Sequence, residues 1–241
     1  MKKLFFIAAG LILALTACQK DETTGPDSGT VSSSFTVTIP SNGVQTRSVA
    51  EDFGKGTLVN RCILEIYRGD ALYSRIEKGV TDGAVTFDDL RMLASQTYDF
   101  VFWADCAKGN ETNGFEDKTY VTENGLTNIT EKGAFVGNSD QRDAFFFCLS
   151  KEVTGTFSEP VKLYRPFGLL TVKTLDLSAI GEQSLKPTKY TAKFKALPNA
   201  FNARTGETSG STDVAYTAEL AKTDGTVSMD FLWAGTDKAD L

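Results

Sequence analysis

The chain has 241 residues, a formal net charge of −6 at pH 7 and no histidine. An acidic surface disfavours nucleic acid and anionic lipid headgroups as electrostatic partners. The lack of histidine excludes Ser-His-Asp and Cys-His catalysis, histidine-ligated zinc and the usual acid–base group near neutral pH. The sequence therefore predicts no catalytic residue, no metal and no cofactor, and it favours a structural or binding protein over an enzyme.

The N-terminus has the pattern of an export signal. A short basic start precedes an apolar run over residues 4–17, which is too short for a membrane span of about 18 residues or more. The run ends in Leu15-Thr16-Ala17-Cys18, which resembles the lipobox of bacterial lipoproteins. That resemblance implies a signal peptide over residues 1–17, removed on export, and a palmitate-bearing lipid on Cys18.

A polar segment follows Cys18 and predicts how the protein is attached. Residues 18–33 are rich in Thr, Ser, Gly and Asp, a composition typical of a flexible tether. The acidic Lys20-Asp21-Glu22 step resembles the surface-export signal of such lipoproteins. Because the chain is acidic, membrane contact has to come from the lipid, which contributes about 0.8 kcal/mol per buried methylene. We expect a lipid-anchored outer-membrane protein displayed on the cell surface.

Short runs of β-forming residues separated by turn signals fill the rest of the chain. Strands are expected at 35–39, 61–67, 71–76, 84–87, 98–103, 145–149, 161–164, 169–175, 189–195, 214–220 and 227–233, and single helical turns at 88–94 and 178–184. This spacing predicts an all-β chain of β-sandwiches. We expect an N-terminal sandwich over residues 34–158 and a C-terminal one over residues 159–241, which is small or truncated.

The aromatic run Tyr98-Asp99-Phe100-Val101-Phe102-Trp103 allows two interpretations. A strand with apolar residues on both faces is typical of a sheet that is covered on both sides. The same rings, if exposed, would form a platform for stacking sugars. Core packing is the expected role, because polar partners are not interleaved regularly along the run.

The cysteines beyond Cys18 lie in or near apolar runs and lack metal-motif spacing. Cys62 and Cys148 are expected in the core, since free cysteine is among the most buried residue types. A Cys106–Cys148 disulfide is left open by the sequence.

Several short motifs together resemble the fimbrillin-like surface lipoproteins of the Bacteroidales. Besides the lipobox, they are a strand followed by Gln45-Thr46-Arg47-Ser48, an aromatic strand ending in Phe102-Trp103-Ala104, Arg165-Pro166-Phe167-Gly168, and Phe201-Asn202-Ala203-Arg204-Thr205-Gly206. The resemblance implies two tandem Greek-key, transthyretin-like β-sandwich domains. It also implies surface display and, in some members, assembly into pili.

The resemblance further implies a mechanism of assembly. In polymerising members a protease cuts after an arginine near the end of the first strand, and an extended segment of the next subunit fills the groove that this strand leaves. Here the matching bond is Arg47–Ser48, and the removable strand carries Phe35, Val37 and Ile39 on one face. The simpler alternative is that Arg47 is a solvated loop residue.

Two functions follow as expectations. The first is a structural or adhesive component of pili, whose partners are other fimbrial subunits or ligands on host or bacterial surfaces. Residues 234–241 lack the alternating apolar residues of a donor strand, so a tip, an anchor or a non-polymerising relative fits as well as a stalk subunit. The second is a glycan-binding surface lipoprotein of a nutrient-uptake system.

Overall fold

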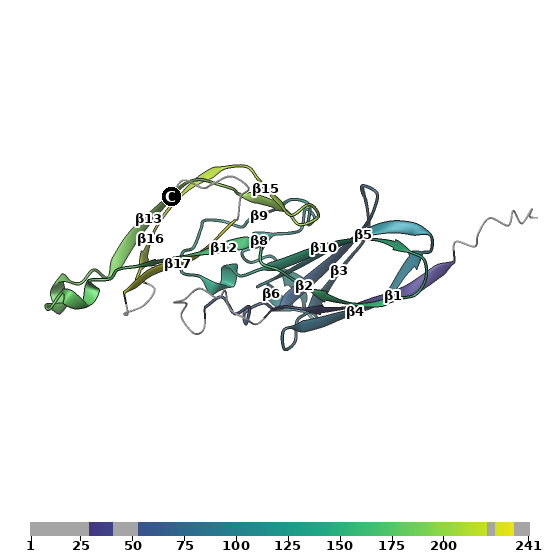
Figure 1. Cartoon of the computed structure of the whole chain (residues 1–241), viewed down its shortest axis with the longest axis horizontal. Helices are drawn as coiled ribbons and strands as arrows, with labels where there is room; N and C mark the ends of the chain where they lie inside the picture. The colour runs from purple at the N-terminus through teal and green to yellow at the C-terminus, as the bar shows by residue number, and fades with distance from the viewer. Residues whose placement is uncertain (1–28, 41–52, 221–224, 234–241) are drawn as a thin grey trace, which may run out of the picture.

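The computed structural model describes residues 29–40, 53–220 and 225–233, and these residues are almost entirely β-structure (Figure 1). The strands are β1 Thr30–Thr38, β2 Arg61–Arg68, β3 Ala71–Gly79, β4 Ala84–Leu93, β5 Gln96–Asp105, β6 Lys108–Asn110, β7 Gly114–Glu116, β8 Tyr120–Val121, β9 Ile129–Glu131, β10 Phe145–Val153, β11 Ser158–Lys162, β12 Phe167–Lys173, β13 Lys189–Leu197, β14 Ala200–Asn202, β15 Glu207–Ser209, β16 Thr212–Glu219 and β17 Thr226–Trp233. Single 3-10 turns lie at η1 Asp140–Arg142, η2 Leu177–Ala179 and η3 Gln183–Leu185. The predicted all-β class is confirmed.

The N-terminal part is a sandwich of two sheets. One sheet has the strand order β11-β1-β4 and the other β10-β5-β2-β3. Alternating apolar residues of both sheets meet between them, because successive side chains of a strand point to opposite faces. The resulting first core includes Phe35, Val37, Cys62, Leu64, Phe87, Met92, Tyr98, Phe100, Phe102, Phe145, Val161 and Leu163.

Two local features set the register of β4. Asp82 and Gly83 both have positive φ, 51° and 72°, as a type I′ hairpin turn requires. The pairing of β4 with β1 shifts at Asp88 and Asp89, where Asp89 has φ 52°. This bulge keeps both Phe87 and Leu90 buried. The helical turn expected at 88–94 is therefore wrong, because long-range pairing with β1 outweighs the local turn tendency of two aspartates.

The sheet β10-β5-β2-β3 is covered on both faces. Tyr98, Phe100 and Phe102 of β5 point into the first core, whereas Val101 and Trp103 point to the opposite side. There a second core is formed by Tyr120 and Ile129, which come from the segment between β5 and β10, together with residues of the C-terminal half, among them Phe167, Phe201, Phe231 and Trp233. The two halves therefore share one central sheet (Figure 1).

The C-terminal half is built from shorter sheets. β12 pairs with β17, β13 with β16, and a four-stranded sheet has the order β15-β14-β9-β8. This last sheet joins strands from both sides of residue 158, and β11, which begins at Ser158, pairs with β1. Strand pairing thus links the two halves of the chain. The domain limits that the sequence suggested, at residues 34–158 and 159–241, stay a prediction.

Candidate functional site

Strand β1 occupies the centre of its sheet. It runs antiparallel to β4, with Val37 opposite Val85, and parallel to β11, with Val37 opposite Val161. Each of its two edges is thus engaged in a backbone hydrogen-bond ladder. A strand that left this position would expose unpaired backbone groups on two neighbours at once.

The side chains of β1 reach the floor of the first core. Phe35 and Val37 are fully buried and Ile39, just after the strand, is 6% exposed. The Phe35 ring lies 4.8 Å from the ring of Phe100 and 5.3 Å from those of Phe102 and Phe157. Burial of such side chains stabilises by roughly 1.5–3 kcal/mol each. Without β1, the sandwich would contain an aromatic-floored groove with strand edges on both sides, and we call this the β1 groove.

The residues that would process this strand lie outside the described part of the chain. Neither Arg47 nor Ser48 falls within it, and the same holds for Cys18 and for residues 1–17. Lipidation at Cys18, cleavage at Arg47–Ser48 and the removal of β1 remain predictions. Phe35, Val37 and Ile39 are described, and the structure brings them to one face as their spacing predicted.

Residues 54–56, which precede β2, are held by an ion-pair cluster of Asp140, Asp143 and Arg165 that we call the Arg165–Asp143 clamp. Asp140 accepts a hydrogen bond from Gly54 N at 2.7 Å, and Asp143 accepts one from Gly56 N at 3.0 Å. Arg165 donates to both oxygens of Asp143, at 2.6 and 2.8 Å, and to the carbonyl oxygen of Gly54. Burial raises the pKa of Asp143 despite its partner Arg165.

The clamp gives a structural role to the Arg165-Pro166-Phe167-Gly168 motif. Residues 54–56 are bound to Asp140 in η1, to Asp143 just after it and to Arg165, which lies two residues before β12. The chain on the C-terminal side of residue 53 would thus stay attached if the preceding segment were cut. Sequence reasoning singled out this motif but did not predict the partners of Arg165.

A buried charge network on the second face of the shared sheet was also not predicted. Arg61, 2% exposed, donates to both oxygens of Asp105 at 2.9 Å and to Asp117 Oδ1 at 2.9 Å. Burial by itself would raise the pKa of Asp117, but hydrogen bonds from Thr122 and Arg61 outweigh it and lower the pKa. Buried charges that are fully paired are typical of structural networks.

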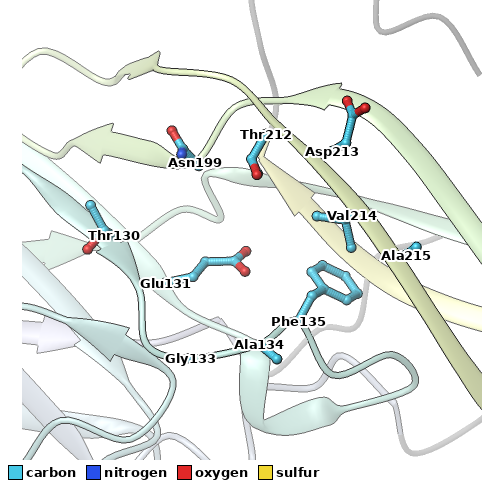
Figure 2. A pocket seen from close by; sticks show the side chains of 10 residues that line it. All are labelled: Thr130, Glu131, Gly133, Ala134, Phe135, Asn199, Thr212, Asp213, Val214 and Ala215. Atoms are coloured by element: carbon cyan, nitrogen blue, oxygen red, sulfur yellow. The ribbon is translucent and has the colours of Figure 1, made fainter.

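A cavity of about 450 Å³ lies between β9, the loop that follows it and β16. Figure 2 labels its ten lining residues and shows the carboxylate of Glu131 pointing into it, toward Phe135. Asn199 and Thr212 lie on the far wall, and a smaller hollow that shares Glu131 and Asn199 continues to Trp233. We call this site the Glu131 cavity; sequence reasoning missed it, because its walls come from segments about 70 residues apart.

The aromatic run of β5 is core, as predicted. Tyr98, Phe100, Phe102 and Trp103 are all fully buried, so the sugar-stacking platform is wrong for these rings. These rings are buried on opposite faces of β5 because a core packs on each face of the sheet β10-β5-β2-β3.

The described cysteines all have free thiols. Cys62 is fully buried in the first core, as predicted, while Cys148 is only partly buried against the second. Burial raises the pKa of the Cys148 thiol to about 11, which disfavours the reactive thiolate at neutral pH. The structure has no Cys106–Cys148 disulfide.

Within the described ranges, no group of three or more acidic, cysteine or histidine side chains is arranged to hold a metal ion. The same residues include no helix with the length and hydropathy of a membrane span.

Comparison with protein families decides the classification of the chain. The model of the "Family of unknown function (DUF6562)" matches residues 25–241. The chain belongs to this family. A comparison with curated proteins found no match.

Comparison with solved structures found several similar chains. A candidate polysaccharide-binding protein (DUF1812) from Bacteroides thetaiotaomicron VPI-5482 has a TM-score of 0.51 at 9% identity, covering 84% of this chain and 71% of that one. A candidate adhesin from Bacteroides ovatus has a TM-score of 0.50 at 12% identity, covering 84% and 68%. The fimbrial anchor protein Mfa2 from Porphyromonas gingivalis has a TM-score of 0.42 at 14% identity, covering 86% and 74%. At these identities the first two matches establish a shared fold.

Proposed function

We propose that this protein is a cell-surface structural or adhesive subunit of the fimbrillin-like type, anchored in the outer membrane through a lipid on Cys18. In this proposal the lipid anchors the uncut chain. Cleavage at Arg47–Ser48 then releases β1 together with the lipid-bearing N-terminus, and an extended segment of a neighbouring subunit takes the place of β1. The main support for this proposal is the central position of β1 between β4 and β11, where Phe35 and Val37 are fully buried. The candidate adhesin among the fold relatives supports the same class of function.

Strand exchange fits the geometry of the β1 groove. An incoming strand can form main-chain hydrogen bonds with both neighbours, while its alternate side chains fill the positions of Phe35 and Val37. An edge strand would offer only one ladder and a weaker site. The Arg165–Asp143 clamp supports the proposal, because it would hold residues 54–56 in place after the cut.

Cleavage is tested by limited trypsin digestion of the native full-length chain. We expect the first cut after the predicted tether of residues 18–33 to follow Arg47, and the variant Arg47→Gln should abolish this cut. Arg68→Gln is the matched control, since Arg68 is an exposed arginine at the end of β2. An unchanged first fragment in Arg47→Gln would contradict the proposed processing site.

Exchange is tested on the protein cut after Arg47. The released strand should stay bound until a synthetic peptide of residues 29–40 competes it out, because two ladders and buried apolar side chains hold it. The same peptide with Phe35→Asp and Val37→Asp is the control and should not exchange. If the cut protein keeps its full melting temperature and stays monomeric after β1 is removed, strand exchange does not occur in this chain.

A further inference from the structure

The lining of the Glu131 cavity combines polar and apolar side chains and includes two carboxylates, those of Glu131 and Asp213. Glu131 is ion-paired with the buried Arg142, and its other carboxylate oxygen has no hydrogen-bond partner among the described residues. Asp213 instead accepts a hydrogen bond from Ala196 N at 3.0 Å, and Figure 2 shows its carboxylate turned away from the hollow. Neither lysine nor arginine lines the cavity.

Ring packing and hydrogen bonds hold the loop that forms one wall of the cavity. The Arg142 guanidinium lies 3.9 Å from the centroid of the Phe135 ring, and Tyr216 stacks on the same ring at 5.3 Å. Asn138, next to this loop, accepts a hydrogen bond from Met229 N at 2.8 Å and donates to the carbonyl oxygen of Glu219 at 3.1 Å. A site whose side chains are fixed in advance loses less entropy when it binds a ligand.

Two buried donors beside the cavity lack partners within the described residues. They are Arg142 Nε and Trp233 Nε1, and both residues are more than nine-tenths buried. By contrast, Trp103 donates its indole N–H to Asp105 at 3.1 Å. Unsatisfied buried polar groups cost about 1–3 kcal/mol each and are few in native structures; besides these two, the described residues include Thr171 Oγ1 and Thr174 Oγ1. Trp233 lines the smaller hollow that continues from the cavity.

We propose that the Glu131 cavity binds a neutral saccharide unit. Glu131 and the hydroxyl of Thr212 accept hydrogen bonds from sugar hydroxyl groups, the amide of Asn199 donates to a sugar oxygen, and the apolar walls at Phe135 and Val214 contact the C–H faces of the ring. The volume of about 450 Å³ lies in the lower part of the roughly 300–1,000 Å³ range of small-ligand sites.

Other ligand classes fit the site less well. An anion would meet the carboxylate of Glu131 without a lysine or arginine on the wall, and a cation would find that carboxylate already neutralised by Arg142. An extended peptide is bound through a row of unpaired backbone groups or a long groove, whereas this lining consists of side chains around a compact hollow. The inference does not depend on strand exchange at the β1 groove.

The test is binding of the full-length protein to an array of neutral oligosaccharides and polysaccharides, followed by calorimetry with the strongest ligand. We expect Asn199→Ala and Thr212→Val each to weaken binding about tenfold or more, with unchanged melting temperatures, because each removes one polar group at the cavity surface. Asn113→Ala is the matched control, an exposed asparagine in the β6–β7 turn. Short oligosaccharides bound more tightly than the corresponding polymers would identify a chain end, rather than an internal unit, as the ligand.

Three results would overturn the proposal. They are the absence of binding to every neutral glycan, binding confined to acidic glycans, and binding that Asn199→Ala and Thr212→Val leave unchanged. The peptide-exchange assay, run on the same variants, separates failure at this cavity from failure at the β1 groove.

Discussion

The N-terminal sandwich and the β13–β16 ribbon show the same alternation of apolar and polar residues but bury it to different depths. In the sandwich Phe35, Phe87 and Phe100 are fully buried. On the ribbon the corresponding inward residues, such as Phe194 and Tyr216, are only partly buried. The alternation therefore determines which face of a strand is apolar, and the number of layers around it determines how completely that face leaves water.

The difference follows from what covers each element. The sheet β10-β5-β2-β3 carries a core on each face, whereas the ribbon is a two-stranded sheet with one face packed on the loop around Phe135. Beyond the ribbon, at the end of the molecule around η2 and η3 (Figure 1), Leu175 is 96% and Leu185 69% exposed. Four variants test this contrast.

The largest effect is expected for Trp103→Ala at the shared sheet. Trp103 is fully buried, and its ring lies 5.3 Å from Tyr120 and 6.2 Å from Trp233. Truncating a buried aromatic costs about 3–5 kcal/mol, a large part of the roughly 5–15 kcal/mol of a typical domain. Urea denaturation of the variant should show a single unfolding transition, shared by both halves, at a lower urea concentration than in the unsubstituted protein. The exposed Tyr164→Ala is the control, and two separated transitions would show that the halves do not unfold together.

A smaller, pH-dependent effect is expected for Asp117→Asn. The folded pKa of Asp117 is lowered by Thr122 and Arg61, so its stabilisation is present above the unfolded pKa of about 3.9 and is lost as pH falls through the folded value. We expect a loss of about 1–3 kcal/mol at pH 7, which shrinks below about pH 4. Urea denaturation at several pH values measures it, and a difference that is constant with pH would contradict the charge network.

Phe194→Ala tests the ribbon directly. Because Phe194 is only partly buried, the loss should be about 1–2 kcal/mol, less than the roughly 1.5–3 kcal/mol gained by burying a whole side chain. Thermal denaturation of the full-length chain measures it. A cost equal to that of Trp103→Ala would mean that the ribbon is covered in solution, for example by a second copy.

The smallest effect is expected for the double variant Leu175→Ser and Leu185→Ser. Both side chains are largely exposed, and surface substitutions usually change stability by less than about 0.5 kcal/mol. The melting temperature should stay within error, and solubility should rise. A loss of more than about 1 kcal/mol would show that these leucines are packed in solution.

Much of the strand content could be predicted from local pattern. The alternation of Phe35, Val37 and Ile39 predicted a strand with one buried face, and the two-sided aromatic run of β5 predicted a doubly covered sheet. Prediction failed for β6, β7, β9, β14 and β15, because strands of three residues carry too few alternations to be distinguished from loops. It also failed at Asp88-Asp89, where pairing with β1 converts an apparent turn into a bulge.

The sequence by itself determined the all-β class, the apolar face of β1 and the absence of histidine chemistry, because these depend on residue type and on a period of two along the chain. Only the tertiary structure decided that β1 lies between β4 and β11, that Arg165 clamps residues 54–56, and that Glu131 faces Asn199 and Thr212 across a cavity. These contacts join segments about 50 to 120 residues apart. Local pattern cannot specify them, because any strand with one apolar face can pair with several others until the whole core is packed.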